Sequence, residues 1–278
     1  METFDAAWLA LREPIDQRSR AELLLEPLCE AWRARGWTRV LDLGSGTGAN
    51  FRYMAPRLPV GQAWVLVDHD PYHVRELGHL SRPDSVTELT VMSGDVAEEG
   101  LTAAQDADLV TASAMLDLVS EAWLHRIVDC CASEGRGAYF ALSYNGEVEW
   151  VPLDERERSA ETDVDDAFVR TAVNAHQLRD KGLGPALGPM AGRTAERLFQ
   201  GAGYRTRLVL SPWRLAIAET PVADRLIEGW AAAAAEVQPD EAARVHGWAD
   251  RRREDVTRGR VMLTVGHCDL LALPADRL

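Results

Sequence analysis

The chain has 278 residues, of which 46% are hydrophobic, enough for a substantial buried core, and this excludes disorder of the whole chain. Its formal net charge is −14, whereas nucleic-acid binding needs clustered lysine and arginine, so we expect no nucleic-acid partner. The chain starts with no basic segment followed by an apolar run, and no later stretch reaches about 18 uninterrupted apolar residues. We therefore expect a soluble, cytoplasmic protein that does not contact a membrane.

Apolar residues recur at helical spacing over residues 4–34 and predict two helices that break near Pro14. Four charged side chains cluster at this join: Arg12, Asp16, Arg18 and Arg20. A lid over a ligand that bears a carboxylate would use such a guanidinium. We favour the plainer interpretation, a solvated helix junction, because isolated charge patterns are weak indicators of a site.

Strand-like and helix-like segments alternate from Val40 to Leu142, which is typical of a parallel sheet with helices on both faces. The predicted strands are residues 38–43, 63–68, 86–91, 107–112 and 136–143. The predicted helices between them are residues 49–57, 71–80, 100–105 and 120–132.

An acidic run interrupts this alternation at residues 145–166, where nine acids stand against two bases. A charge run of this kind is usually a solvated loop, which we favour over a flap that attracts a cationic substrate. The chain then continues with predicted helices at 163–180 and 191–202, a strand at 204–210, a helical pair at 220–236 and 239–257, and a last strand at 260–273. No linker long enough to separate two domains interrupts this order.

The four cysteines have no CxxC spacing, and the adjacent pair Cys130 and Cys131 is a poor arrangement for zinc. We predict free thiols in the core and no metal site.

The most informative stretch is Val40 to Asn50, in which an apolar strand leads through Gly44, Gly46 and Gly48 into a helix. Glycines let the backbone turn sharply and bring amide groups close to a ligand at the helix N-terminus. The same spacing also satisfies the fingerprint of dinucleotide binding, so the turn by itself is ambiguous.

Three acids argue against a nicotinamide dinucleotide. Asp42 lies inside the first strand, where a dinucleotide fold normally keeps an apolar residue. Asp68 and Asp95 end the next two strands, and all three acids therefore belong to the carboxyl edge of the sheet, where open α/β sheets bind ligands. Each acid alone would fit an N-cap or a turn, but three together point to a cofactor site.

The pattern Asp-Leu-Gly-Ser-Gly-Thr-Gly, with Asp68 and Asp95 after the second and third strands, resembles the class I S-adenosylmethionine-dependent methyltransferases. The resemblance is specific over about residues 38–143 and extends to the rest only in the order of elements. It implies a doubly wound, mostly parallel, seven-stranded α/β sheet of order 3-2-1-4-5-7-6 with an antiparallel last strand. S-adenosylmethionine would be the cofactor.

The resemblance also implies roles for individual residues. Gly44, Gly46 and Gly48 would approach the methionine part of the cofactor, and Asp42 would help to hold its ammonium group. Asp68 would accept both ribose hydroxyls, because a carboxylate matches a vicinal diol. His69 would lie beside the adenine, Asp95 would accept a hydrogen bond from the exocyclic amine of the adenine, and the Val96 backbone would complete that contact. Ala112 and Ser113 would surround the sulfonium.

The fourth strand ends Thr-Ala-Ser-Ala-Met-Leu-Asp at residues 111–117. Family members that methylate exocyclic amines of bases or glutamine side chains usually carry an Asn/Asp-Pro-Pro-aromatic motif here, which this chain lacks. A small-molecule substrate is therefore favoured. Met115 and Asp117 would lie near its side of the site, although we interpret Met115 mainly as a packing residue.

A general base is needed only if the nucleophile must lose a proton. His176 is the best candidate, with Asp180 one turn later to orient it, although a lone histidine is more often structural. Tyr144, directly after the fifth strand, is better placed topologically. The candidate substrate-binding residues are Trp150, Phe168, Asn174, Gln177 and Lys181.

We conclude from the sequence that a single methyltransferase domain fills residues 1–278. It would begin with a helical lid at 1–35, followed by a cofactor-binding half at 36–143 and a substrate-side insert at 144–192. The rest of the sheet would lie at 193–278, interrupted by helices at 220–257. Its reaction would be in-line methyl transfer to an O, N or C nucleophile. Two alternatives remain: the same fold binding S-adenosylmethionine for regulation or other chemistry, and an NAD-dependent oxidoreductase. The oligomeric state is not indicated.

Overall fold

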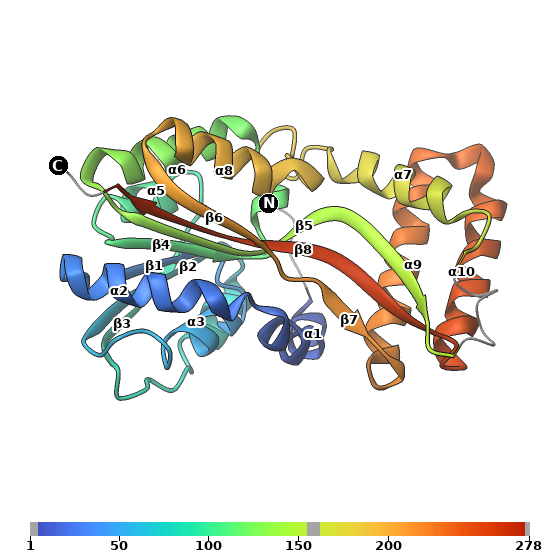
Figure 1. Cartoon of the computed structure of the whole chain (residues 1–278), viewed down its shortest axis with the longest axis horizontal. Helices are drawn as coiled ribbons and strands as arrows, with labels where there is room; N and C mark the ends of the chain where they lie inside the picture. The colour runs from blue at the N-terminus through green and yellow to red at the C-terminus, as the bar shows by residue number, and fades with distance from the viewer. Residues whose placement is uncertain (1–4, 155–161, 276–278) are drawn as a thin grey trace.

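The computed structural model describes residues 5–154 and 162–275 (Figure 1). Eight strands form one sheet. They are β1 Arg39–Leu43, β2 Gln62–Asp68, β3 Val86–Ser93, β4 Leu109–Ser113, β5 Gly137–Pro152, β6 Tyr204–Leu210, β7 Trp213–Leu215 and β8 Val261–Pro274. The α-helices are α1 Ala6–Ser19, α2 Leu25–Arg35, α3 Ala49–Met54, α4 Pro71–Leu77, α5 Glu99–Ala104, α6 Glu121–Glu134, α7 Asp166–Gln177, α8 Ala191–Gly201, α9 Thr220–Val237 and α10 Ala242–Thr257.

The strand order is β3-β2-β1-β4-β5-β8-β6, with β7 paired to β8. The strands from β1 to β5 pair in parallel, and β8 runs antiparallel to β5, β6 and β7. The predicted doubly wound α/β sheet and its order are therefore confirmed. Sequence patterns missed only the short strand β7, whose three residues, Trp213–Leu215, are too few to show a period.

Two hydrophobic cores lie on the two faces of the sheet (Figure 1). One face is packed by α5, α6 and α8. The second core is formed by α2 and α3 at one end of the molecule and by α7, α9 and α10 at the other, with Ile15 of α1 between them. No helix in the described ranges is long and apolar enough to cross a membrane.

The first predicted helix boundary is wrong. Pro14 lies inside α1, and the break comes at Arg20, whose ψ of 142° is not helical. A short 3-10 turn, Glu22–Leu24, follows and leads into α2. Proline removes one hydrogen bond from the helix, but the packing of α1 against β7 keeps it continuous (Trp8 and Trp213 rings 6.4 Å apart).

The solvated loop predicted for residues 145–166 is also wrong over the part that the structure describes. Residues up to Pro152 continue β5 and pair with β8. The acids Glu147 and Glu149 alternate with the more buried Val148 and Trp150, so they lie on one face of a strand. Residues 155–161, which contain part of the acidic run, lie outside the described residues.

The acids at the end of the run are paired with arginines of α10. Asp163 and Asp165 both bind Arg251, at 2.5 and 2.8 Å, and Asp166 binds the fully buried Arg252. Sequence spacing could not show these pairs because more than 80 residues separate the partners. The four cysteines are free, as predicted.

Candidate cofactor and substrate site

The glycine turn begins where β1 ends and leads into α3. The N–H of Ser45 donates to Val67 O of β2 at 3.0 Å, which holds the turn against the neighbouring strand. Gly44 has a φ of +62°, and a Cβ there would lie 2.8 Å from Met115 Sδ. The positive φ favours glycine at this position, and a larger residue would also have to displace the Met115 side chain, which follows β4.

Asp68 is held rigidly at the end of β2 and is 4% exposed. Its Oδ2 accepts from Gly46 N at 2.7 Å and its Oδ1 from Asp70 N at 2.9 Å. His73 Nδ1 lies 3.3 Å from the same Oδ1. A carboxylate has about four acceptor sites, so lone pairs remain for a ligand's hydroxyl groups. Within the described ranges, neither ring nitrogen of the neighbouring His69 has a hydrogen-bond partner, although its Nδ1 lies 3.8 Å from Asp68 Oδ1.

A buried polar network lies behind the turn. Asn50 Nδ2 donates to Asp42 Oδ1 at 2.6 Å and to Thr111 Oγ1 at 3.1 Å. Arg20 Nη2 donates to Asn50 Oδ1 and to Ser113 Oγ, both at 3.0 Å. Burial raises the pKa of Asp42 to about 7, against the opposing effects of Asn50 and Arg20.

The glycine turn, Asp68, Asn50 and Ser113 border a cleft whose space is about 760 Å³ when the solvent at its mouth is included. Of the predicted cofactor-binding residues, Gly44, Gly46, Asp68, His69 and Ser113 line it. The further lining residues are Leu9, Arg12, Asp16, Ser45, Thr47, Ala49, Asn50, His73, Ala114, Met115 and Leu118.

The other predicted cofactor residues do not line this cleft. Asp42 is fully buried, and Asn50 takes its place at the wall. Gly48 starts α3. Ala112 and Val96 belong to the core between the sheet and α6, and the Val96 carbonyl accepts from Trp123 Nε1.

Asp95, at the end of β3, is also absent from the cleft wall. Its Oδ1 accepts from Ala97 N at 2.6 Å, which closes a tight turn. This turn fixes the carboxyl group beyond the strand end, on the same edge of the sheet as Asp68.

Helix α1 covers the cleft through Leu9, Arg12 and Asp16. Asp16 and Arg20 are each only 5% exposed, so the prediction of a solvated helix junction is wrong for them. Arg12 Nε pairs with Asp16 Oδ2 at 2.8 Å. Arg18 alone matches the prediction of an exposed charge, since its side chain is 45% exposed and pairs with Glu219.

Comparison with known protein families gives one match to this region. A family model described as a methyltransferase domain matches residues 40–135, from β1 to the end of α6. Over these residues, which make up less than half of the chain, the sequence is similar to a methyltransferase domain. No curated protein matches the sequence of the chain.

Solved structures give loose similarities over most of the chain. The YcgJ protein from Bacillus subtilis is 13% identical, with 92% of this chain and 100% of that chain covered and a TM-score of 0.47. A cyclopropane-fatty-acyl-phospholipid synthase-like protein from Lactobacillus casei is 14% identical, with 92% and 98% covered and a TM-score of 0.49. YjhP from E. coli is 18% identical, with 95% and 100% covered and a TM-score of 0.44.

The predicted substrate residues of the methyltransferase are only partly brought together. Tyr144 OH donates to Asn174 Oδ1 at 2.9 Å, and Asn174 Nδ2 donates to Gly146 O at 3.1 Å. Tyr144 and Trp150 line a second pocket of about 330 Å³, bounded by β5, α7, α9 and α10. Its other lining residues are Val148, Asp166, Val169, Arg170, Val173, Trp230 and Trp248.

His176 lies outside both pockets. Its Nε2 is 3.2 Å from Glu236 Oε2 of α9, and Glu236 also accepts from Arg179. The predicted pairing with Asp180 is wrong, because Asp180 caps the following loop through Gly182 N. His176 therefore joins two helices, and the geometry gives it no contact with the cofactor cleft.

Gln177, Lys181 and Phe168 are likewise absent from the walls of both pockets. Phe168 carries the guanidinium of Arg244 over its ring, 4.1 Å from the centroid. The residues that sequence reasoning missed, above all Asn50, Trp230 and Trp248, carry no local signal of a site. They can be recognised as pocket residues only from the packing of elements that are distant in sequence.

Proposed function

We propose that the methyltransferase domain transfers a methyl group from S-adenosylmethionine to an O, N or C nucleophile of a small molecule, and that residues 1–278 act as one domain. The observation that carries the proposal is the position of α1, which covers the cleft beside the glycine turn. A covered cleft admits a small acceptor, and the net charge of −14 disfavours a polyanion.

The residues present fit the cofactor. Asp68 would accept the ribose hydroxyls with its remaining lone pairs, and the Gly44–Gly46 turn would lie along the methionine part. Arg20 is buried, and its Nε and Nη1 have no hydrogen-bond partner in the described part of the chain. Such unpaired donors are costly, and the carboxylate of the cofactor would satisfy them.

For the other residues predicted to bind the cofactor, the structure suggests how each would act. Asp42 would act through Asn50, which it holds in place, and not by direct contact. Asp95 stays a proposal for the exocyclic amine of the adenine, with the Val96 backbone beside it, and His69 would lie next to the base. Ala112 supports Ser113, which reaches the cleft wall.

The bound cofactor supplies an electrophilic methyl group on a sulfonium. The chain holds the acceptor in line with that methyl group and excludes water. Leu9, Met115 and Leu118 make the adjoining wall apolar, and Arg12 and Asp16 close it with an ion pair. These groups leave a confined space next to Ser113 for the reacting atom of the acceptor.

Replacing Asp68 with alanine tests the cofactor site. We expect the Kd for S-adenosylhomocysteine, measured by calorimetry, to rise at least tenfold, because two charge-assisted hydrogen bonds to the ribose are lost. Asp240→Ala, at an exposed position between α9 and α10, is the matched control and should leave the Kd unchanged. NAD should not bind to either protein.

Methyl transfer is then measured as release of S-adenosylhomocysteine with pools of small metabolites. Turnover with a metabolite pool is expected. Binding of S-adenosylhomocysteine without turnover on any pool would favour a regulatory role, and tight NAD binding would favour the oxidoreductase.

A further inference from the structure

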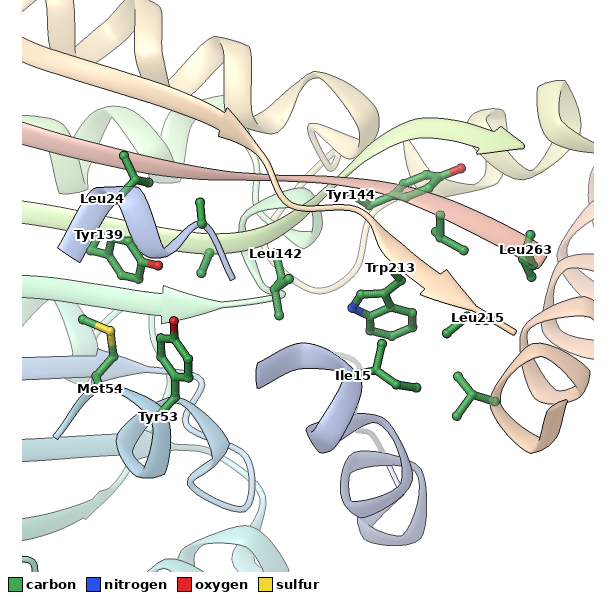
Figure 2. Packing of buried hydrophobic residues seen from close by; sticks show 14 of the residues in the cluster. Ile15, Leu24, Tyr53, Met54, Tyr139, Leu142, Tyr144, Trp213, Leu215 and Leu263 are labelled. Atoms are coloured by element: carbon green, nitrogen blue, oxygen red, sulfur yellow. The ribbon is translucent and has the colours of Figure 1, made fainter. Parts of the chain in front are cut away.

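Six side chains from five elements meet beside the cofactor cleft, and we call them the acceptor cluster: Arg12 and Asp16 of α1, Asp117 after β4, Tyr144 of β5, Trp213 of β7 and His267 of β8. The Arg12 guanidinium lies 5.2 Å from the centre of the Trp213 ring. The His267 ring is 4.9 Å from Trp213 and 6.2 Å from Tyr144. Figure 2 shows Trp213 pointing from β7 toward Ile15 of α1.

The cluster is continuous with the cleft of the methyltransferase. Arg12 and Asp16 line that cleft directly, together with Met115, two residues before Asp117. The charge of Arg12 is close enough to act on both Asp117 and His267. Asp117 is not itself at the cleft wall, but it lies between Met115 and Leu118, which are, so the cluster borders the cleft.

Three polar atoms of the cluster lack a hydrogen-bond partner in the described ranges: Asp16 Oδ1, Asp117 Oδ1 and Trp213 Nε1. The three residues are only 5%, 8% and 3% exposed. Buried polar groups are nearly always paired, and an unpaired one costs free energy. Two carboxylate oxygens without hydrogen-bond partners next to a cleft are best satisfied by a ligand that donates hydrogen bonds to them.

The charge of the cluster favours a cation. Within the cluster, Asp16 and Asp117 stand against one guanidinium, that of Arg12, and outside it Lys181 also acts on Asp117. His267 adds no charge, because burial, assisted by Arg12, lowers its pKa to about 3. The faces of Trp213 and Tyr144 also favour a cation, and Arg12 already occupies one such position.

We infer that the methyl acceptor is an amine, bound as an ammonium ion in the acceptor cluster, and that Asp117 is the catalytic residue that takes its proton. The inference rests on the proposed methyl transfer. An N–H bond of the ammonium breaks and the proton passes to Asp117 Oδ1. The freed lone pair forms the bond to the methyl carbon, and the electrons of the methyl–sulfur bond leave with sulfur. The methylated amine then carries the positive charge.

The surroundings of Asp117 suit a base. Burial raises the pKa of its carboxyl group to about 6, although the N–H groups of Asp117 and Tyr144 and the charges of Arg12 and Lys181 oppose the rise. Cys268 of β8 also faces it. Burial has the opposite effect on an ammonium, whose pKa falls, so the two groups approach each other in proton affinity.

The test compares amines with matched alcohols. The probes are propylamine, benzylamine and 2-phenylethylamine, each against the alcohol of the same skeleton, with protein saturated in S-adenosylhomocysteine. We expect at least one amine to bind tenfold more tightly than its alcohol, and Asp117→Asn to abolish that preference with the affinity for S-adenosylhomocysteine unchanged. Equal binding of all three amines and their alcohols would overturn the inference. Asp240→Asn is the control.

Turnover provides a second readout. For an amine acceptor, kcat/KM of the wild type should rise with pH through about 6, as Asp117 loses its proton, and Asp117→Asn should lose that rise. If Asp117→Asn does not fold, Asp16→Asn replaces it and should reduce the amine preference. Methylation of alcohols but not of amines would overturn the inference while the proposed methyl transfer stands. Failure to bind S-adenosylhomocysteine would count against the methyl transfer itself.

Discussion

Asp117 lies beside the cofactor cleft, and the burial of its carboxyl group lowers the folding stability of the protein. Its pKa is 3.8 in an unfolded chain and about 6 in the folded one, so the folded state binds the proton more tightly. Folding stability therefore falls as pH rises from about 4 to 6 and stays lower above that window. Asp42, whose pKa rises to about 7, acts in the same direction.

Removing the charge at Asp117 should therefore stabilise the unliganded protein. We expect Asp117→Asn to raise the free energy of unfolding at pH 8 by up to about 3 kcal/mol, since each pKa unit corresponds to about 1.4 kcal/mol. Most of the difference should vanish at pH 4. Urea unfolding at the two pH values measures it, and a gain that is the same at both would contradict the burial argument.

A comparison of alanine variants at Gly44 and Gly61 distinguishes the effect of backbone strain from the effect of a changed cofactor site. Both have positive φ, +62° and +90°, so alanine at either should cost about 1 kcal/mol. Only at Gly44 does the new Cβ meet a neighbour, Met115 Sδ, at 2.8 Å; nothing lies within 4 Å at Gly61.

We therefore expect Gly44→Ala to weaken binding of S-adenosylhomocysteine at least tenfold and Gly61→Ala to leave it unchanged. Thermal unfolding and calorimetry are measured on the same samples. Equal losses of affinity in both variants would show that the turn acts only through stability.

Among the elements, the end of α1 is held beside the cleft partly by one buried carboxylate, that of Asp269. Asp269 of β8 is fully buried and accepts four hydrogen bonds. They come from Ala21 N at 2.9 Å, Leu142 N at 2.8 Å, Ser211 Oγ at 2.6 Å and Tyr139 OH at 3.2 Å. Ala21 follows Arg20, the residue that caps the end of α1, and Leu142, with a φ of +54°, marks an irregularity of β5. The lid is therefore anchored to the last strand of the sheet.

Helices α7 and α10 are joined by Arg252, which is fully buried. Its Nε donates to Asp166 Oδ1 at 2.9 Å, its Nη1 is 3.2 Å from Asp255 Oδ2, and its guanidinium lies 4.4 Å from the Trp150 ring centre. This places it directly behind the wall of the second pocket.

Replacing Arg252 with methionine should destabilise the protein by about 3 kcal/mol, because it leaves Asp166 without its buried partner. Arg258→Met is the matched control: its pairing with Glu254 is one turn apart and exposed, so the loss should be within about 0.5 kcal/mol. Urea unfolding compares the two, and equal losses would rule out a special role for the buried pair.

At the scale of the whole molecule, the two ends of the sheet share one hydrophobic cluster. Val40 and Leu66 in the cofactor half, Ile227 of α9 and Val245 of α10 all belong to it. This continuity supports our proposal of one domain. The net charge of −14 would in addition attract a cationic acceptor from solution.

Local patterns were sufficient for the first half of the chain. The apolar strands, the glycine turn and Asp68 follow one another within about 30 residues, and a strand–turn–helix unit is defined by neighbours in sequence. The acidic run was misjudged because its partners, Arg251 and Arg252, lie on a helix that the run itself could not reveal.

The sequence by itself determined the α/β sheet and, through the family resemblance, its strand order, because these depend on residue types at short, regular spacing. Only the tertiary structure decided that α1 borders the cleft, that Asn50 stands between Asp42 and the cleft, and that Asp117 lies in one cluster with Trp213 and His267. Such contacts join residues up to about 250 positions apart, as Ala21 and Asp269 are. Burial and unpaired polar atoms at these positions are properties of packing, which no local pattern encodes.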